Sequence, residues 1–556
     1  MDRTLIKKSR NMLTLKYSLL FFFLITFGAL HSKTQDDSFM EKVSTKSTNI
    51  TDYRYKDTIP SECSLVRLEN GKIVFMTKQS GEMKPFFIKA IETGFWDTRY
   101  EENVDYNSVF SDMVDIGANV AYVMIHWDDI EIKDNCFNFS FTDKIESIAR
   151  KNGIKIKWVL FLHAQYNGVP TPDCTNSWTF HLDDRDSCNY TMQWPKQNGK
   201  IYKNIKILVD NGGIRPLHVY GHKDIFYRII RMLKKLASHY KESDTVIGVQ
   251  IGNEEGFSFL DESDYNPVTA GLYEEWKVKT NKCDYAQFKR EAMNWWWKQF
   301  TTAFHEIDPY KILSTNLDAG QAEAGDKNRV EMTGTSASFY KEGNLDVIGT
   351  MLYKQWGYDA LLGLDERYNE HSYNFSLPIL IPSEIGIGNF NKPEDFNSFV
   401  IHTLERGAQG FGVYCYGEVR KELPDSVSAR KVLKNMFANI SNNEHLIYSG
   451  LPGPGDVQCT VSEAGLKVSH LNSEKEGTLA MIYKPILVEE ENKISSGDIE
   501  IHLLAKVSGK YSIKIYQSGK IIKNEDIIIT KDRPTSILLE ESKYIDPIFV
   551  NISMKK

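Results

Sequence analysis

Two glutamates stand out because each follows a short apolar run of the kind that forms a buried strand. Glu254 comes after residues 246–252, and Glu384 comes after residues 379–383. Brought together, two carboxyl groups can cleave a glycosidic bond, because one protonates the leaving oxygen while the other meets the positive charge that develops at the anomeric carbon. This chemistry needs no metal ion and no cofactor, and we expect neither. The alternative is that each glutamate is merely exposed at a strand end or paired with a loop lysine.

Eight such apolar runs alternate with amphipathic stretches. The strand candidates are residues 86–91, 119–125, 154–162, 246–252, 311–316, 345–351, 379–383 and 410–416. The helix candidates are residues 106–116, 143–152, 223–240, 285–307, 360–368, 395–406 and 426–440. Continuous, β-branched strands are typical of a parallel sheet that is covered on both faces. Eight alternating units predict an α/β fold, a (β/α)8 TIM barrel. A doubly wound open sheet competes with it, but no Gly-x-Gly-x-x-Gly motif opens a helix after the first strand.

Reactive groups in a TIM barrel lie at the C-terminal ends of its strands. This rule places Glu254 and Glu384 in one pocket and makes them the candidate catalytic residues. It also selects six candidate substrate-binding residues at strand ends, which are His126, Trp127, His163, Asn253, Tyr353 and Tyr416.

The first 32 residues have the layout of a cleaved secretory signal. Bases between Lys7 and Lys16 precede an apolar stretch at residues 17–30, and Ser32 is a small residue followed by polar sequence. The apolar stretch is short for a bilayer, and no later segment is long and apolar enough for a membrane helix. We therefore expect a secreted or periplasmic protein with no stable membrane insertion.

Composition divides the remaining chain into three parts. Residues 33–62 are rich in Ser, Thr, Lys and Asp, which indicates a flexible linker. Residues 63–445 hold the barrel and begin with a hairpin, in which Asn70-Gly71 supplies the positive φ angles of a tight turn. Beyond residue 450 the helical period disappears, and residues 451–556 predict a small antiparallel β-sandwich.

Charge and cysteine content exclude several other classes of function. The net charge is −7 without a basic run, and such a surface repels nucleic acid and anionic membranes. Seven cysteines fit no paired Cys-x-x-Cys metal pattern, although Cys174 and Cys188 share one loop and are candidates for a disulfide. Aromatic residues reach 12%, which suits the stacking of sugar rings but is explained equally well by core packing.

The segment 164–221 is too long to be a simple connection between a strand and a helix. It contains five residues that either stack on sugar rings as a lid or form a small core of the loop itself: Tyr166, Trp178, His181, Trp194 and Tyr220.

The run Val-Gln-Ile-Gly-Asn-Glu-Glu-Gly at residues 249–256 resembles the acid/base strand of clan A retaining glycoside hydrolases. It is closest to the β-galactosidase families thirty-five and forty-two, whose pattern is Val-Gln-x-x-Asn-Glu-Tyr-Gly. Gly-Ala-Asn-Val-Ala-Tyr-Val-Met-Ile-His-Trp at residues 117–127 and Phe-Asn-Phe-Ser at residues 137–140 resemble the second strand of these families and the start of the next helix. The resemblance covers residues 85–440.

The resemblance implies a role for four of the selected residues. Glu254 matches the general acid/base, Glu384 the nucleophile, Asn253 the residue that binds the sugar 2-hydroxyl, and Tyr353 the tyrosine that donates to the nucleophile. Two departures leave the sugar open. Glu255 replaces the tyrosine of the family pattern, and the Gly-Pro-Tyr-Ile-Cys-Ala-Glu run after the third strand is absent.

We expect an exported retaining β-glycosidase that is β-galactosidase-like and acts on terminal β-linked sugars of an oligosaccharide or polysaccharide. An endo-acting β-glycanase is the alternative within enzymes, and it would need an open cleft. A non-catalytic carbohydrate-binding protein on the same barrel is the alternative outside enzymes. Turnover of an aryl β-glycoside separates an enzyme from a binding protein.

Overall fold

The computed structural model of the 556-residue chain describes these residues: 55–56, 63–68, 71–94, 104–162, 184–185, 188–194, 196–197, 199–203, 218–257, 264–317, 333–335, 339–353, 379–388, 395–421, 426–463, 465–485, 496–543 and 546–555. They lie in one compact unit, Arg54–Lys556. His163, Cys174 and the helix expected at 360–368 lie outside the described residues.

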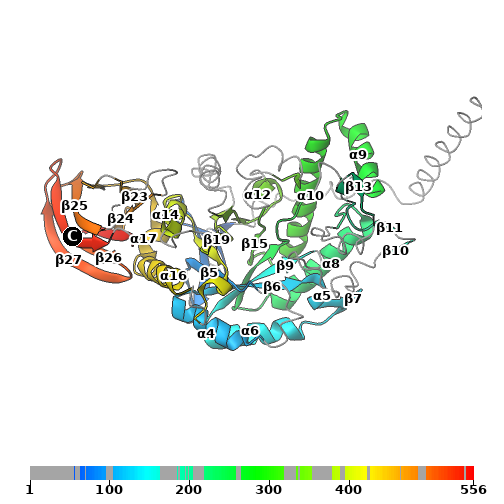
Figure 1. Ribbon diagram of the computed structural model, residues 1–556, viewed down its shortest axis with the longest axis horizontal. Coiled ribbons are helices and arrows are strands. Elements are labelled where there is room, and N and C mark those ends of the chain that lie inside the picture. Colours follow the sequence, from blue (N-terminus) through cyan, green and yellow to red (C-terminus); the bar gives the residue numbers. More distant parts are fainter. Residues whose placement is uncertain are drawn as a thin grey trace, which may run out of the picture. The chain divides into compact units, whose positions relative to one another are not determined.

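The centre of the fold is a curled, parallel, eight-stranded sheet (Figure 1). Its strands in chain order are β5 (Ile88–Glu92), β6 (Val120–His126), β9 (Lys155–Phe161), β14 (Val246–Ile251), β15 (Ile312–Ser314), β17 (Met351–Leu352), β19 (Glu384–Gly386) and β20 (Gly410–Tyr414). The first strand, β5, pairs with both the second and the last, β6 and β20, which a barrel requires. This confirms the expected α/β class and strand order.

The two ends of this order, β15 and β17, are joined through Asp346. The main-chain N–H of Asp346 donates to the carbonyl of Leu313 at 2.9 Å, and the Leu313 N–H donates to the Asp346 carboxylate at 2.8 Å. Asp346 directly precedes β16 (Val347–Ile348), which pairs with β18 (Ile379–Leu380). The sixth and seventh strands are thus each split into two short parts, and the arrangement fits the predicted TIM barrel.

Helices flank the sheet on its outer side, and α4 and α6 lie side by side there (Figure 1). The larger helices are α4 (Tyr106–Ile116), α6 (Ser140–Asn152), α8 (Lys223–Tyr240), α9 (Pro267–Thr280), α10 (Tyr285–His305), α14 (Phe396–Glu405), α16 (Ser426–Ser441) and α17 (Glu444–Ser449). The sequence analysis had not predicted α9 or α17. In α10, Trp296 and Trp297 are buried against neighbouring aromatic rings, so this tryptophan run is part of the core.

A small antiparallel sheet covers the N-terminal end of the barrel. Its strands are β2 (Ser64–Arg67), β3 (Ile73–Gln79) and β4 (Glu82–Pro85), and β1 (Tyr55–Lys56) pairs with β2. The predicted hairpin is therefore present, with a third antiparallel strand that was not predicted. Leu65 and Phe75 from this sheet share a buried cluster with Phe86 and with the strand residues Ile88 and Val120.

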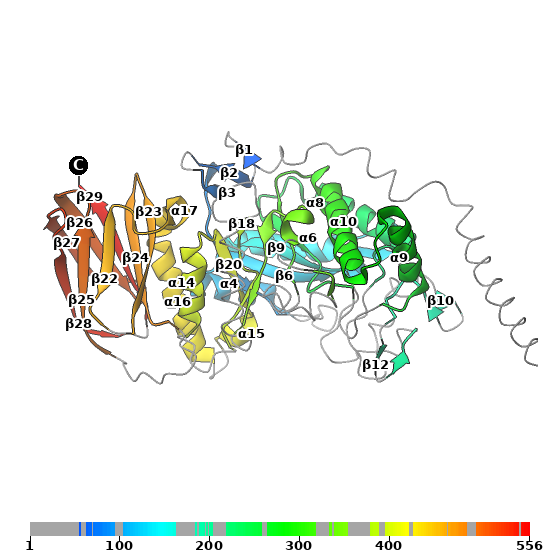
Figure 2. The same cartoon turned by 90° about the horizontal axis from the view of Figure 1, so that it is seen from above.

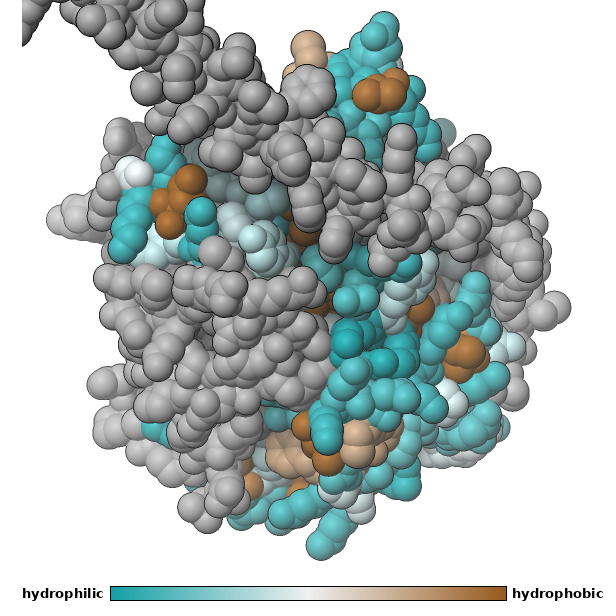
Figure 3. Space-filling model, turned by 90° about the vertical axis from the view of Figure 1, so that its right-hand side faces the viewer, coloured by the Kyte–Doolittle hydropathy of each residue, from teal (hydrophilic) through white to brown (hydrophobic). Residues whose placement is uncertain are grey.

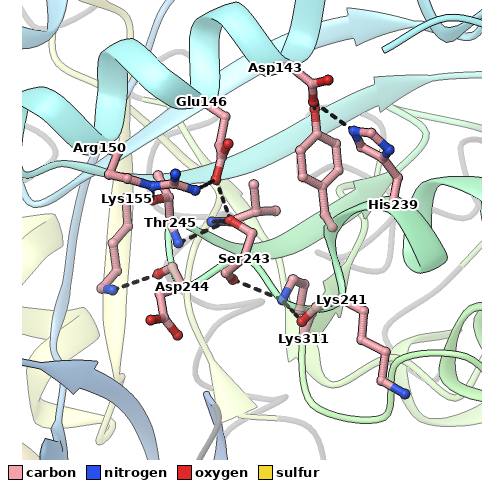
Figure 4. Close-up of polar contacts among 12 residues, drawn as sticks. Asp143, Glu146, Arg150, Lys155, His239, Lys241, Ser243, Asp244, Thr245 and Lys311 are labelled. Atoms are coloured by element: carbon pink, nitrogen blue, oxygen red, sulfur yellow. Dashed lines mark hydrogen bonds and ion pairs between the residues drawn. The ribbon is translucent and has the colours of Figure 1, made fainter. Parts of the chain in front are cut away.

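Polar contacts fix the loop that leads into β14 (Figure 4). The Ser243 hydroxyl donates to Glu146 of α6 at 2.6 Å, and the Arg150 guanidinium donates to the Thr245 hydroxyl at 3.2 Å. The Lys311 ammonium, at the start of β15, donates to the Ser243 carbonyl at 3.2 Å. These contacts hold the loop before β14 against α6 and against the residue that precedes β15.

Two antiparallel sheets follow α17 (Figure 2). Their strands are β21 (Leu451–Pro452), β22 (Val457–Val461), β23 (Lys467–Ser473), β24 (Gly477–Tyr483), β25 (Ser496–Ala505), β26 (Gly509–Gln517), β27 (Lys520–Ile529), β28 (Thr535–Lys543) and β29 (Ile548–Met554). The six-stranded sheet has the order β21-β23-β24-β29-β26-β27, and the other is β22-β25-β28. Ile513 and Val550 of the first sheet share one apolar core with Ile501 of the second.

No helix within the described ranges is long and apolar enough to cross a membrane. On the face shown in Figure 3, the coloured atoms are mainly hydrophilic, and the hydrophobic atoms form small, separate patches.

Helices α4 and α6 each end at a glycine, and substitution of these glycines tests how tightly the outer helices pack. Gly117 after α4 has φ 105° and Gly153 after α6 has φ 69°. A Cβ atom at Gly117 would lie 3.2 Å from the Cβ of Phe437 in α16, whereas a Cβ at Gly153 meets no atom within 4 Å. Gly153→Ala should lower the free energy of unfolding by about 1 kcal/mol through the positive φ alone.

Gly117→Ala should lower it by roughly 2–3 kcal/mol, because overpacking against Phe437 adds to the strain. Urea unfolding of the two variants beside the wild type measures the difference. Equal losses would mean that α16 can move away from α4 at little cost.

Candidate active site

One side-chain amide, that of Asn316, contacts both candidate catalytic residues. Asn316 lies just beyond β15 and is fully buried. Its Oδ1 accepts from the main-chain N–H of Glu254 at 2.9 Å, and its Nδ2 donates to Oε1 of Glu384 at 2.7 Å. Nδ2 also lies 2.8 Å from Oδ1 of Asn253. The structure thus brings Asn253, Glu254 and Glu384 to one point at the C-terminal ends of the strands.

Glu254 lies in a strained turn directly after β14. Gly252 has φ 75° and Glu254 has φ 53°, a value that L-residues other than Asn and Asp adopt only at an energetic cost. A side chain at position 252 would collide with Glu255, since a Cβ there would lie 2.2 Å from its Cγ. The bond from the Glu254 N–H to Asn316 holds this turn, and the Glu254 side chain stays half-buried.

Glu384 is almost fully buried, with 3% of its surface exposed. It is the first residue of β19 rather than the residue after a strand, because the predicted strand at 379–383 is limited to β18. Its Oε1 accepts from Asn316, and its Oε2 accepts from the Tyr353 hydroxyl at 2.5 Å. Burial, and next the charge of Glu384, raise the pKa of Tyr353 well above its usual value, so this hydroxyl keeps its proton and donates. Two donors therefore favour the ionised form of Glu384.

Two predicted binding residues at the end of β6 lie in the protein core. The His126 ring stacks on Phe161 with 5.1 Å between ring centroids, and His126 is fully buried. The indole N–H of Trp127 donates to Glu131 at 2.8 Å, and the ring packs against His218. The structure thus gives both residues packing contacts, and their role in binding stays a prediction.

The eighth strand, β20, ends at Tyr414, two residues before the predicted end at Tyr416. Tyr416 is the first residue of α15 (Tyr416–Val419), and its hydroxyl donates to Asp112 of α4 at 3.3 Å. The two-residue alternation of a strand ends at Tyr414, so it does not extend to Tyr416. Tyr414 packs on Tyr353 with 5.9 Å between ring centroids, and the binding role of Tyr416 stays a prediction.

The sequence analysis did not identify two buried ionisable residues next to the site. Glu92 ends β5 and is 1% exposed, and its Oε1 has no hydrogen-bond partner among the described residues. Burial, and next the charge of Glu384, raise the pKa of Glu92 well above its usual value. Lys157 of β9 is 2% exposed, and its Nζ lies 3.6 Å from the ring centroid of Tyr122. Burial lowers the pKa of Lys157 to about 7, although the charges of Glu92 and Glu384 oppose the change.

The residue that departs from the family pattern, Glu255, is engaged inside the protein. It accepts a hydrogen bond from the hydroxyl of Tyr220, whose ring packs against Trp297 at 5.2 Å. Tyr220 and Trp194 are both buried, which favours packing over a lid for these two of the five aromatic or histidine residues in the long segment. Tyr166, Trp178 and His181 lie outside the described residues.

The described ranges contain no group of three or more His, Cys, Asp or Glu side chains that could hold a metal ion. Cys136, Cys283, Cys415 and Cys459 are free thiols within these ranges.

Residues 202–333 match the family model Glyco_hydro_42, described as beta-galactosidase. The matched part includes Asn253, Glu254 and Asn316, whereas Glu384 lies beyond it. This match confirms the resemblance to clan A glycoside hydrolases that the motifs predicted. No curated protein sequence matches the chain.

Three solved structures are similar to the chain at low identity. A β-galactosidase from the psychrophilic Marinomonas ef1 has 11% identity and a TM-score of 0.46, with 66% of this chain and 62% of that chain covered. A GH30 endoxylanase from Clostridium papyrosolvens C71 has 9% identity and a TM-score of 0.46, with 89% and 100% covered. An exo-β-1,4-mannosidase from Opitutaceae bacterium strain TAV5 has 13% identity and a TM-score of 0.40, with 70% and 63% covered. The chain therefore spans less than two thirds of the first of these enzymes.

Lys157 offers a test of the buried charge by stability alone. Its pKa is about 7 in the folded protein against 10.5 for an exposed lysine, so the unfolded chain binds its proton more strongly. The cost to the folded state is complete below pH 7 and falls as the pH rises from 7 to 10.5. Lys157→Met should therefore stabilise the protein at pH 6 by roughly 4 kcal/mol, after a loss of about 1 kcal/mol for the hydrogen bonds removed.

The stabilisation by Lys157→Met should shrink as the pH rises, and urea unfolding at a series of pH values measures this change. A variant that is less stable than the wild type at pH 6 would contradict a buried, poorly compensated ammonium.

Proposed function

We propose that this protein is an exported retaining β-glycosidase that removes terminal β-linked sugars through Glu254 and Glu384. The carrying observation is the Asn316 amide, which joins the main chain of Glu254 to the carboxylate of Glu384. Support also comes from the family match, which includes the Asn253-Glu254 pair. For export the support is the signal-like segment at residues 1–32, and N-terminal sequencing of the secreted protein tests its removal near residue 32.

In the first step, a carboxylate oxygen of Glu384 attacks the anomeric carbon while Glu254 transfers its proton to the leaving oxygen. The glycosidic bond breaks, and an ester bond forms between the sugar and Glu384. The donors Asn316 and Tyr353 hold the carboxylate of Glu384 in place for this attack. In the second step, Glu254 takes a proton from water, which attacks the same carbon and releases Glu384.

The rest of the proposal concerns substrate and architecture. We infer that the barrel is closed. We also infer that the two antiparallel sheets at residues 451–556 form a β-sandwich that supports it. The substrate is an oligosaccharide or polysaccharide with a terminal β-galactoside-like sugar. The endo-acting alternative is distinguished by products, because it would shorten a polymer internally without releasing single sugars.

The roles of the two glutamates can be separated with a panel of nitrophenyl glycosides. Wild-type protein should release a sugar of the same anomeric configuration as its substrate, measured by proton NMR. Glu384→Gly should lower kcat by roughly 10⁴-fold or more on every substrate, and added azide should give an inverted glycosyl azide. Glu254→Ala should spare the first step only for substrates with good leaving groups, because these need no protonation.

Glu146→Gln is a matched control, since Glu146 is a buried glutamate on α6 whose partners are Ser243 and Arg150. Its kcat should stay close to that of the wild type. An inverted azide product from the Glu254 variant would exchange the two roles, and absence of turnover on the whole panel would favour a binding protein.

Loss of the Asn316 side chain should lower kcat as much as loss of a donor that contacts the substrate directly. Asn316→Ala removes a donor to Glu384 and the acceptor that holds the Glu254 turn, so kcat should fall roughly 100-fold. Asn439→Ala is the control. Asn439 of α16 is equally buried, and its side chain accepts from the Gly519 N–H at 2.8 Å, so it bonds to the C-terminal sheets and not to the two glutamates. Steady-state kinetics and urea unfolding should show similar stability losses for both variants but a loss of kcat for Asn316→Ala alone. A similar kcat for both would leave Asn316 with a structural role only.

A further inference from the structure

A short hairpin within the segment 164–221 carries lysines and no acidic residue. Its strands are β12 (Lys196–Gln197) and β13 (Lys200–Ile201), which pair antiparallel. Residues 187–209 contain four lysines and no Asp or Glu, although the whole chain has 74 acidic residues against 67 Lys and Arg. The hairpin is therefore a local region of positive charge on a protein whose net charge is −7.

Two lysines of this region lie over neighbouring aromatic rings. Nζ of Lys196 is 5.5 Å from the ring centroid of Tyr265, and Nζ of Lys203 is 5.2 Å from that of Trp194. The two rings belong to bonded residues, because the Tyr265 N–H donates to the Trp194 carbonyl at 3.1 Å. Neither lysine makes an ion pair with a carboxylate among the described residues. A ring attracts a cation without neutralising its charge, so both ammonium groups keep N–H donors for an anion.

The residues just before the hairpin are bonded to the loop that follows Glu254. Nε2 of Gln193 donates at 3.0 Å to the carbonyl of Gly256, two residues after Glu254. The Trp194 N–H donates to the buried carboxylate of Asp264 at 2.7 Å. These bonds hold the hairpin next to the loop that begins at the candidate acid/base.

The side of Glu254 is the side on which the leaving group departs. A general acid protonates the glycosidic oxygen, so it must lie next to the part of the substrate that leaves. Loops that adjoin Glu254 therefore border the remainder of an oligosaccharide or polysaccharide whose terminal sugar is bound. Since the hairpin adjoins such a loop, its positive charge favours substrates whose leaving units are anionic.

We propose that Lys196 and Lys203 form a subsite for acidic sugar units, so that the substrate is a polysaccharide with carboxylate or sulfate groups next to its terminal sugar. The proposal rests on the proposed function, because it concerns the leaving-group side of the same site. It deepens that function by naming the chemical class of the polymer. One chemistry recognises both anions, an ammonium group that donates to a negatively charged oxygen.

A subsite of this kind acts on binding and not on the chemical step. Its contacts lie away from the reacting carbon and are the same in the ground state and the transition state, so their loss raises KM and leaves kcat unchanged. Lys203 is exposed and Lys196 is half-buried, so salt should weaken their attraction for an anion. A hairpin with only a structural role would alter KM for neutral and charged substrates alike.

The experiment uses three substrates in which the preferred sugar is β-linked to a disaccharide. The two units of the disaccharide carry carboxylates, carry sulfates or are neutral. At low salt the wild-type KM for at least one charged substrate should be roughly 10-fold lower than for the neutral one, the effect of two exposed ion pairs. About 0.5 M NaCl should remove most of this difference. The double variant Lys196→Gln/Lys203→Gln should show equal KM values on all three substrates and an unchanged kcat.

The double variant Lys514→Gln/Lys520→Gln is the matched control. Both lysines are exposed on the C-terminal sheets, and the change in net charge is the same, so the wild-type preference should remain. Lys200→Gln is a second control within the hairpin. The pairing register points Lys200 to the face opposite Lys196, so its substitution should have a smaller effect than Lys196→Gln. Urea unfolding of each variant confirms that the measured protein is folded.

The outcomes separate the two claims. A preference for the carboxylate substrate alone would identify a uronate-containing polymer, and a preference for the sulfate substrate alone a sulfated one. Equal wild-type KM values on all three substrates, or a preference that survives in Lys196→Gln/Lys203→Gln, would overturn the subsite while leaving the glycosidase intact. Absence of wild-type turnover on any glycoside would instead overturn the proposed function itself.

Discussion

The burial of charge at the C-terminal ends of the strands is the constraint on which the site depends. Glu384 is 3% exposed and, as the proposed nucleophile, would react in its ionised form, so protein donors must replace the water it has lost. Asn316 and Tyr353 supply two of them, from the ends of strands β15 and β17. Asn316 also accepts from the main-chain N–H of Glu254, so one side chain contacts both candidate catalytic residues. The strand order that places the ends of β15 and β17 near β19 therefore also supplies the donors to Glu384.

How much of this could be predicted from the sequence differs between levels of structure. Continuous apolar runs and amphipathic stretches predicted the sheet and most of its helices, because buried positions recur in the sequence with the period of each element. The helix α9 left no such signal because it buries little beyond Thr269 and Trp276. Its caps, Asn266 and Pro267, were the available evidence. The split of the seventh strand into β18 and β19 depends on pairing partners far away in the chain, which no local pattern contains.

The candidate site was predictable in type but not in detail. The rule that strand ends carry function found Glu254 and Glu384, and applied to the fifth strand it would also have selected Asn316. Lys157 could not be found by that rule, because it lies within β9 and faces inward. Its signal was a lysine in a run that is otherwise largely apolar. The eighth strand was predicted to continue to Tyr416, whereas α15 begins there.

Polar groups at the two ends of the barrel have different surroundings. At the N-terminal end, Ser243, Glu146 and Lys311 contact one another or nearby carbonyls (Figure 4). At the C-terminal end, Glu92 has an oxygen with no hydrogen-bond partner among the described residues, and within β9 burial disfavours the charge of Lys157. Arrangements that lower stability persist where function requires them. The polar contacts at the N-terminal end and the close packing of the sheet thus contribute to the stability of the protein. This stability offsets the cost of the strained and poorly solvated groups at the C-terminal end.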